Sequence, residues 1–339
     1  MDKKKFAELV QCIQEGTYQN IHSLLVVKEG QIAFEAYFSG YEWDYDRPQF
    51  RGEFVRYGVD SLHNLASVTK SITSTLIGIA IDRGLIPGVD EKLVSYFPEY
   101  ASLFDDRKRA ITLHHVFTMT SGLEWNEMES TLDNRENDLI RLFRVRDPKK
   151  YILSKPVTSD PGTKWYYNSG GTNLLGEVIR RATGSRMDDF AKAALFDPLG
   201  ITRFEWDHLN TEMIFASGNL KLCARDLAKL GLLFLDGGVW RGERIVSQEW
   251  IAEATKAHAI PSGADGYGYH WWLETFHVGS SSFDSYYAAG WGGQRLMVFP
   301  ALELVVVMTG GNYVEDEPVD EILIRYILPA SFSPTLGRG

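Results

Sequence analysis

A serine and a lysine are spaced along the chain so that they can act as a nucleophile and its base. They are Ser67 and Lys70, at the start of a mostly apolar run that continues to Ile81. In a helix, residues three apart are neighbours on one face, so the hydroxyl and the amine would lie side by side. Burial and the positive potential of a helix N-terminus both favour the neutral amine, which can take the hydroxyl proton. The pair could therefore attack a carbonyl carbon. The pattern is short, and it also fits a helix-capping serine followed by a surface lysine.

Three further segments add to this pair. Residues 118–123 are Thr-Met-Thr-Ser-Gly-Leu, residues 161–170 are Pro-Gly-Thr-Lys-Trp-Tyr-Tyr-Asn-Ser-Gly, and residues 289–294 are Ala-Gly-Trp-Gly-Gly-Gln. The templates Gly-x-Ser-x-Gly, His-Glu-x-x-His, Gly-x-x-x-x-Gly-Lys and Gly-x-Gly-x-x-Gly are absent from the sequence. The histidines show no spacing typical of metal ligands, so we expect neither a metal nor a cofactor.

Taken in order, these segments resemble the motifs of the serine β-lactamase and penicillin-binding-protein superfamily. The sequence is most similar to the class C-type branch, which includes esterases, D-amino-acid peptidases and 6-aminohexanoate-dimer hydrolases, from about residue 20 to residue 325. The resemblance implies that Ser67 is the acylated nucleophile, that Lys70 holds or accepts its proton, and that Tyr167 is a general base or acid. It also implies an oxyanion hole made by the backbone N–H groups of Ser67 and Trp291, each donor contributing about 3–4 kcal/mol.

The resemblance also implies which residues contact the substrate. Ser169 stands where the family's Tyr-x-Asn motif has asparagine, and its hydroxyl can still hydrogen-bond the lysine. Gly290 and Trp291 lie where the family has the strand of its Lys-Thr-Gly or His-x-Gly motif. Trp125 follows the segment at 118–123, and Asn219 falls in a segment that the family places in its cleft. We expect these five residues to bind substrate.

Two departures from the family pattern change the expected substrate. Ser169 presents one polar group where asparagine presents two. Residues 288–290, Ala-Ala-Gly, lack the lysine or histidine that helps β-lactamases and D,D-peptidases to hold a substrate carboxylate. β-Lactam and D-Ala-D-Ala substrates are therefore less expected than simple esters or amides. The adjacent Trp271 and Trp272 are expected to pack in the core.

Helices and strands that could position these residues follow from the periodicity of apolar residues. A first helix is predicted at Phe6–Glu15, a loop at Trp43–Val59, and helices from Ser67 and through most of residues 90–200. A final helix is predicted at Val319–Ile327. Strands are predicted at Ser23–Val27, Ile32–Phe38, Tyr267–Leu273, Phe283–Ala288, Arg295–Phe299 and Leu302–Met308.

Strands at both ends of the chain with helices between them predict an α/β (α+β) fold, and the resemblance implies that it is of the β-lactamase type. An antiparallel sheet flanked by helices would carry an inserted all-helical domain. We expect residues 1–80 and 205–339 to form the sheet domain, residues 81–204 to form the helical domain, and the active site to lie in the groove between them.

Composition narrows the class of protein. The 339 residues are 44% hydrophobic and 24% charged, which is typical of a globular protein. A net charge of -10 disfavours nucleic acid and anionic membranes as partners. Only Cys12 and Cys223 are present, no apolar run is long enough to span a bilayer, and no signal peptide is recognisable, so we expect a cytoplasmic protein. The oligomeric state is left open.

The function predicted is that of a metal-independent serine hydrolase. Ser67 would form an acyl-enzyme with a small-molecule ester or amide, as in a carboxylesterase or a small-amide hydrolase. One alternative is a β-lactamase or D,D-peptidase, and another is a catalytically silent binding or assembly protein on the same scaffold. The natural acyl and leaving groups stay open, because the loops at 43–59 and 124–137 would shape the pocket.

Overall fold

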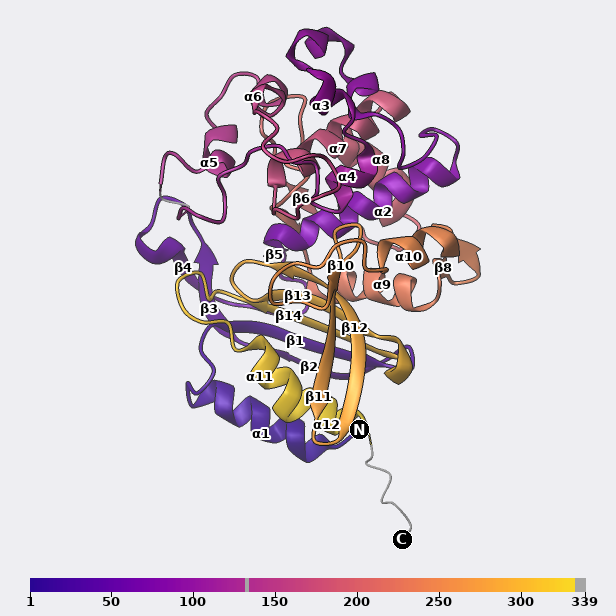
Figure 1. Ribbon diagram of the computed structural model, residues 1–339. Helices are drawn as coiled ribbons and strands as arrows, with labels where there is room; N and C mark the ends of the chain where they lie inside the picture. Colours follow the sequence, from indigo (N-terminus) through magenta and orange to yellow (C-terminus); the bar gives the residue numbers. More distant parts are fainter. Residues whose placement is uncertain (132–133, 333–339) are drawn as a thin grey trace. The chain divides into compact units, whose positions relative to one another are not determined.

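The structure, a computed structural model, describes residues 1–131 and 134–332 (Figure 1). Two compact units share the chain. The first contains Met1–Val68, Lys221–Asp236 and the residues from Glu274 onward, and the second contains Thr69–Leu220 and Gly237–Leu273. The domain boundaries predicted from the sequence, at 80/81 and 204/205, stay a prediction beside this division.

The large sheet has seven strands in the described residues, in the order β10-β11-β12-β13-β14-β1-β2. The pairs β1–β2, β1–β14, β12–β13 and β13–β14 are antiparallel. The strands are β1 (Ile21–Lys28), β2 (Gln31–Tyr37), β10 (Gly266–Tyr267), β11 (Trp272–Val278), β12 (Ser281–Gly290), β13 (Gln294–Phe299) and β14 (Leu304–Gly310). In β1, all residues but the last are buried, which is typical of a strand covered on both faces.

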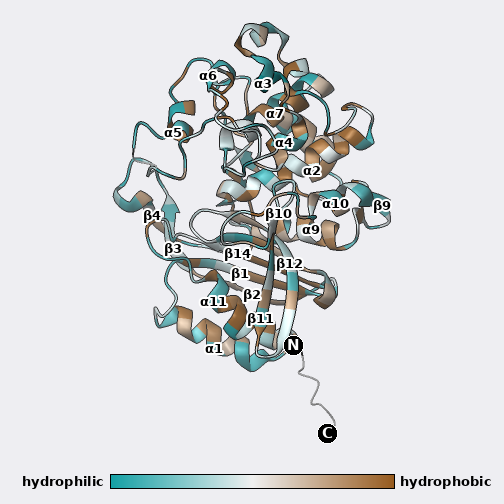
Figure 2. Cartoon of the chain, in the orientation of Figure 1, coloured by the Kyte–Doolittle hydropathy of each residue, from teal (hydrophilic) through white to brown (hydrophobic). Residues whose placement is uncertain are grey.

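Helices cover both faces of this sheet in the first unit. On one face, α1 (Lys3–Gln14) and the C-terminal segment of α11 (Val319–Ile322), η7 (Leu323–Ile327) and α12 (Leu328–Ser331) share a core with alternate residues of β1, β13 and β14. On the other face, α9 (Ala224–Leu235) packs against β13 and β14 through Gly231. In Figure 2, α1 and α11 carry both hydrophobic and hydrophilic segments, and β12 is coloured largely teal and white.

A second hairpin lies where the sequence analysis predicted a loop over Trp43–Val59. Strands β3 (Ser39–Trp43) and β4 (Arg51–Arg56) pair antiparallel, so the prediction of a loop was wrong at Trp43 and at Arg51–Arg56. The aromatic and charged side chains hid the strand pattern, because several of them are exposed on both faces of this short hairpin. Further along, β5 (His63–Asn64) pairs with the end of β7 (Leu220–Leu222).

The second unit is mainly helical and is built around α2 (Thr69–Asp82) and α7 (Ser169–Thr183), which pack against each other. Residues 69–80 of α2 are all buried, which explains the apolar run in the sequence. Its other helices are α3 (Asp106–Arg109), α4 (Leu113–Phe117), α5 (Asp138–Leu142), α6 (Pro148–Ser154), α8 (Met187–Ala191) and α10 (Gln248–Ala254), with the short helical turns η3 (Leu93–Tyr96), η4 (Pro98–Leu103) and η5 (Lys192–Phe196). Its short strands include β6 (Glu205–Trp206), β8 (Val239–Trp240) and β9 (Glu243–Arg244). One more helical turn, η1 (Pro48–Phe50), belongs to the first unit.

The strand predicted at Tyr267–Leu273 is a turn for most of its length. Residues 268–271 connect β10 to β11, and the backbone of Tyr269 donates to the carbonyl of Ala254, 2.9 Å away at the end of α10. The aromatic residues are buried because this turn packs on α10, and burial rather than strand pairing produced the apolar pattern. No helix in residues 1–131 or 134–332 is long and apolar enough to cross a membrane.

Candidate active site

The predicted site residues fall into two groups, one in each compact unit. The first unit holds Ser67, Gly290 and Trp291, and the second holds Lys70, Tyr167, Ser169, Trp125 and Asn219.

Ser67 lies in a tight helical turn, η2 (Ala66–Val68), that runs directly into α2. The preceding residue, Ala66, has a φ of 45°, a left-handed conformation that costs about 1 kcal/mol or more for a residue with a Cβ. Two hydrogen bonds fix the turn. The Ala66 N–H donates to Asn64 Oδ1 at 2.8 Å, and the Val68 N–H donates to the Leu65 carbonyl at 3.1 Å. The nucleophile is thus carried on a strained backbone that its own N-terminal flank holds in place.

Two buried histidines anchor that flank. His63 Nδ1 donates to the Asn64 carbonyl at 2.9 Å, so its Nε2 is left to accept from His22 Nδ1 at 2.8 Å. Burial lowers the pKa of His63 to about 4, and burial together with the neighbouring His63 lowers the pKa of His22 to about 2. The pair is therefore neutral near pH 7, and it ties β5, which leads to the nucleophile turn, to β1.

Gly290, at the end of β12, lies directly against the nucleophile turn. A Cβ at this position would be 2.3 Å from the carbonyl oxygen of Leu65 and 3.1 Å from the nitrogen of Ser67. Backbone atoms cannot yield as a flexible side chain can, so only glycine permits this approach. The structure thereby brings Gly290, which was predicted to bind substrate, against Ser67, whose N–H was predicted to bind the oxyanion.

Trp291 follows in the turn between β12 and β13. Gly292 and Gly293 both have a φ of 88°, which glycine adopts without strain and other residues do not. The Trp291 ring lies 4.9 Å from Trp43 and 5.1 Å from Phe50, centroid to centroid. The β3–β4 hairpin therefore supplies aromatic neighbours to the residue whose N–H is predicted to bind the oxyanion.

In the second unit, the structure brings Lys70 and Tyr167 together. Lys70 is only 2% exposed in the first turn of α2, and its Nζ donates to the carbonyl of Ser217 at 2.8 Å. The same Nζ lies 4.8 Å from the centroid of the Tyr167 ring. A buried amine in contact with a phenol is an arrangement through which a proton can be relayed.

Tyr167 owes its place to the start of α7. The next residue, Asn168, caps the helix, with its Oδ1 accepting from the Gly171 N–H at 2.9 Å. Ser169, the first helical residue, donates its hydroxyl to Glu127 Oε1 at 2.7 Å, and its backbone N–H donates to Glu127 Oε2 at 3.0 Å. The sequence analysis expected the lysine as a partner of this hydroxyl and did not identify Glu127.

Trp125 and Asn219 are both largely buried. Trp125 is 2% exposed, contacts Gly170 and donates its indole N–H to Glu127 Oε2 at 2.8 Å. Asn219 has a φ of 57°, and its amide donates to Asp207 Oδ2 at 2.9 Å. It lies two residues after Ser217, whose carbonyl accepts from the lysine. A direct contact of either side chain with substrate stays a prediction.

Two residues near this group were missed by the sequence analysis. Glu127 is one, and it lies 42 residues before its partner Ser169. The other is His270, which is 2% exposed. Its carbonyl accepts from Ser71 Oγ at 2.6 Å, and its Nε2 lies 3.2 Å from Thr172 Oγ1, so it links α2 to α7. Neither residue belongs to a motif, and only the fold brings them to their partners.

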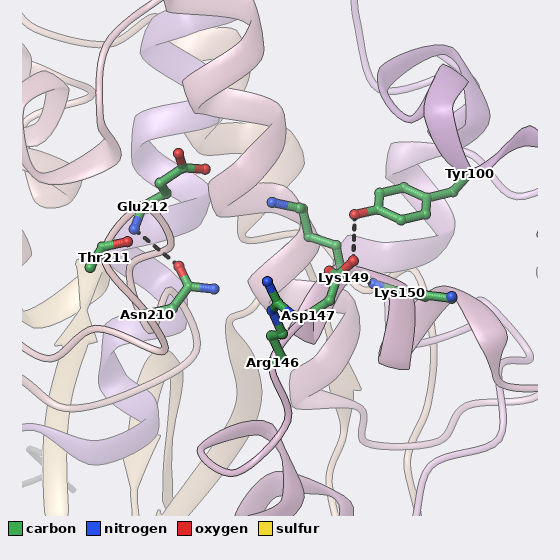
Figure 3. Close-up of a pocket in the computed structure, with 8 residues that line it drawn as sticks. All are labelled: Tyr100, Arg146, Asp147, Lys149, Lys150, Asn210, Thr211 and Glu212. Carbon is green, nitrogen blue, oxygen red and sulfur yellow. Dashed lines mark hydrogen bonds between the residues drawn. The ribbon is translucent and has the colours of Figure 1, made fainter.

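A separate surface pocket lies in the second unit, and none of the predicted site residues lines it. It measures about 500 Å³ and is drawn in Figure 3. Its lining is polar, with Arg146 and Lys149 on the α6 side facing Asn210 and Glu212. Tyr100, Asp147, Lys150 and Thr211 complete it. Among the described residues, no group of three or more His, Cys, Asp or Glu side chains is placed to hold a metal ion.

Comparison with protein families gives a match over nearly the whole chain. The family model described as Beta-lactamase matches residues 9–328. The 6-aminohexanoate-dimer hydrolase of Paenarthrobacter ureafaciens is 29% identical over 277 residues, which cover 75% of this chain and 68% of that protein. The lovastatin esterase of Penicillium rubens is 28% identical over 213 residues, covering 57% of this chain and about half, 51%, of the esterase.

Among solved structures, a family VIII carboxylesterase matches with a TM-score of 0.73 at 19% identity, covering 97% of each chain. At this identity the match shows the fold alone. The family match and the structural match together confirm the predicted superfamily and the fold class, a mixed fold of helices and antiparallel sheet.

Proposed function

We propose, since the chain belongs to the beta-lactamase family, that it is a serine hydrolase which cleaves an ester or amide bond of a small molecule through an acyl-enzyme on Ser67. The observation that carries the proposal is the burial of Lys70 against the Tyr167 ring, in the first turn of the helix that Ser67 precedes. The hydrolase and esterase names of the relatives favour ester and amide bonds.

Acylation begins with the attack of Ser67 Oγ on the substrate carbonyl carbon. The hydroxyl proton passes to Lys70 or to Tyr167, whichever acts as the general base, and the carbonyl oxygen becomes an oxyanion. When the tetrahedral intermediate collapses, the bond to the leaving group breaks, and the relayed proton goes to that group. The hydrogen bond from Lys70 Nζ to the Ser217 carbonyl keeps the amine in position through these transfers.

The oxyanion would be stabilised by the backbone N–H groups of Ser67 and Trp291. The close approach of Gly290 to the Ser67 nitrogen supports this assignment, because it sets the end of β12 against the nucleophile turn. Fixed backbone donors need no rearrangement as the charge develops, which is why they contribute strongly. Water then attacks the acyl-enzyme, gives its proton to the same base, and releases the acid and the free serine.

Substitution of Ser67 by alanine tests the function directly. We expect Ser67→Ala to lose at least about a thousandfold in kcat/KM on p-nitrophenyl butyrate, because the covalent route is removed. The assay is run with a chelator present, since the proposed chemistry uses no metal. Labelling by a fluorophosphonate should occur in the wild type and not in the variant.

Turnover by Ser67→Ala at the wild-type rate would show the proposal to be wrong. A wild type that neither hydrolyses esters or amides nor reacts with the fluorophosphonate would instead indicate the silent scaffold. Nitrocefin in parallel separates the β-lactamase alternative, and we expect the ester to be the better substrate because residues 288–290 offer no side-chain cation to a carboxylate.

A further inference from the structure

Two half-buried tryptophans stand beside Tyr167 and form a wall of aromatic rings. Trp165 and Trp272 lie 5.8 Å apart, centroid to centroid, and 6.3 and 6.5 Å from the Tyr167 ring. The buried Tyr267 supports them, at 5.8 Å from Trp165 and 4.8 Å from Trp272. The sequence analysis expected Trp272 in the core, but it is half-buried. The mechanism above uses neither tryptophan.

Glu127 adds a carboxylate that is held by hydrogen bonds from neutral donors. Its carboxylate accepts from the hydroxyl and the N–H of Ser169 and from the indole of Trp125, and all three donors are neutral. No Lys or Arg of the described residues forms an ion pair with it. The Glu127 side chain is half-buried.

Ser169 places Glu127 close to the aromatic wall, because it donates to the carboxylate and follows Tyr167 by two residues. Burial, followed by the nearby Tyr167 and Glu127, holds the pKa of Tyr267 well above its usual value. The same tyrosine contacts both tryptophans. The carboxylate and the aromatic faces are therefore gathered in one region of the second unit, beside the tyrosine of the proposed relay.

Aromatic faces and a carboxylate without an ion-pair partner are two features that recognise an organic cation, since the face of an indole ring is negative. We propose that Trp165, Trp272 and Glu127 form a subsite for an alkylammonium group of the substrate, next to the bond that is cleaved. This inference rests on the proposed hydrolase function. Lys70 lies over the Tyr167 ring, so the cation binds on the tryptophans rather than on that tyrosine.

Inhibition by tetramethylammonium chloride tests the subsite in the full chain, with p-nitrophenyl butyrate as the neutral reporter and sodium chloride matching the ionic strength. We expect competitive inhibition, about tenfold tighter than by tert-butanol, an uncharged molecule of nearly the same size and shape. Glu127→Gln keeps an oxygen that can accept from Ser169. It should weaken inhibition by tetramethylammonium about tenfold and leave the inhibition constant of the alcohol unchanged. Trp272→Leu should also weaken inhibition by tetramethylammonium.

Glu124→Gln is the matched control. It removes the same charge three residues away, from an exposed side chain, and should leave both inhibition constants unchanged. Glu127→Asp, which retains the charge, should recover part of the ammonium binding. A merely structural role of Glu127 would weaken the ammonium and the alcohol equally.

A pair of substrates gives a second measure. Butyrylcholine and 3,3-dimethylbutyl butyrate have nearly the same shape and differ in charge. The wild type should favour the cationic ester in kcat/KM, and Glu127→Gln should remove most of that preference. Failure of tetramethylammonium to inhibit, or equal effects of Glu127→Gln and Glu124→Gln, would overturn the subsite. If Ser67-dependent turnover of the neutral ester persists in that case, the proposed function stands without the subsite.

Discussion

At the scale of single residues, Gly290 determines how close β12 comes to the nucleophile turn. Gly290→Ala would place a methyl group 2.3 Å from the Leu65 carbonyl oxygen, and one of the two backbones must move. Because the proposed oxyanion donors lie on these two segments, we expect kcat/KM to fall about a hundredfold or more. The rate on p-nitrophenyl butyrate and the melting temperature should be measured together.

Gly88→Ala is the control for that substitution, since a Cβ there meets nothing within 4 Å. It should leave the rate unchanged. A Gly290→Ala protein that folds and retains full activity would contradict the oxyanion-hole assignment. A protein with reduced stability and an unchanged rate would show that the contact serves packing alone.

The residues that could be predicted from the sequence are those that belong to local motifs. Ser67 and Lys70 are three positions apart, and Tyr167 stands in a recognisable segment. Glu127 could not be predicted, because nothing in its neighbourhood signals a partner 42 residues away. The partner of the Ser169 hydroxyl was missed for the same reason: a hydrogen bond between distant segments depends on the packing of α7, which no short pattern encodes.

At the scale of elements, α9 lies close to the sheet because Gly231 has no side chain. A Cβ there would be 2.6 Å from Val305 Cγ1 and 2.9 Å from Leu296 Cδ1. Alanine normally favours a helix over glycine, yet we expect Gly231→Ala to destabilise the protein by about 1–3 kcal/mol through overpacking. Denaturant unfolding provides the measurement. A stabilised variant would mean that α9 can shift away from the strands at little cost.

The His22–His63 pair that joins β1 and β5 should make the protein sensitive to acid. Both folded pKa values lie below the unfolded value of 6.5, so below pH 6.5 the unfolded chain binds more protons than the folded one. The stabilisation is complete above pH 6.5 and is lost as the pH falls towards 4 and below. At pH 5, the lowered pKa of each histidine should reduce the free energy of unfolding by about 2 kcal/mol relative to its value at pH 8.

The test compares the free energy of unfolding at pH 8 and pH 5 in the wild type and in His63→Gln. The variant should show a smaller loss between the two pH values. His277→Gln, at an exposed position, should lose as much as the wild type. If the wild type and His63→Gln lose the same free energy of unfolding between pH 8 and pH 5, the histidine pair does not cause the acid sensitivity.

Elements with a regular period were predicted well, and irregular ones were not. The β1–β2 hairpin and the strands β13 and β14 have continuous apolar patterns, and they lie close to the predicted ranges. The β3–β4 hairpin was missed because its side chains do not alternate between buried and exposed. At residues 268–271, aromatic residues packed on α10 gave an apolar pattern to a turn, and the distinction needs the tertiary structure.

At the scale of the whole molecule, the unit that carries Ser67 is assembled from three separate stretches of chain. Strand β1 pairs with β2 on one side and with β14 on the other, with Leu24 opposite Met308. We expect a chain that stops before β14, at Phe299, to be insoluble and inactive, because one edge of a buried strand is left without its partner. Soluble yield and circular dichroism are the measurements, and a folded, active truncated protein would contradict the expectation.

The position of β1 between β2 and β14 also matters while the protein is being made. Strand β2 follows β1 directly along the chain, but β14, which completes the other edge of β1, is synthesised long after both. Until β14 has been made, a strand of Leu and Val residues therefore has an unpaired edge, which is a site where nascent chains can aggregate. We therefore expect newly made chains to become active only after β14 has been synthesised.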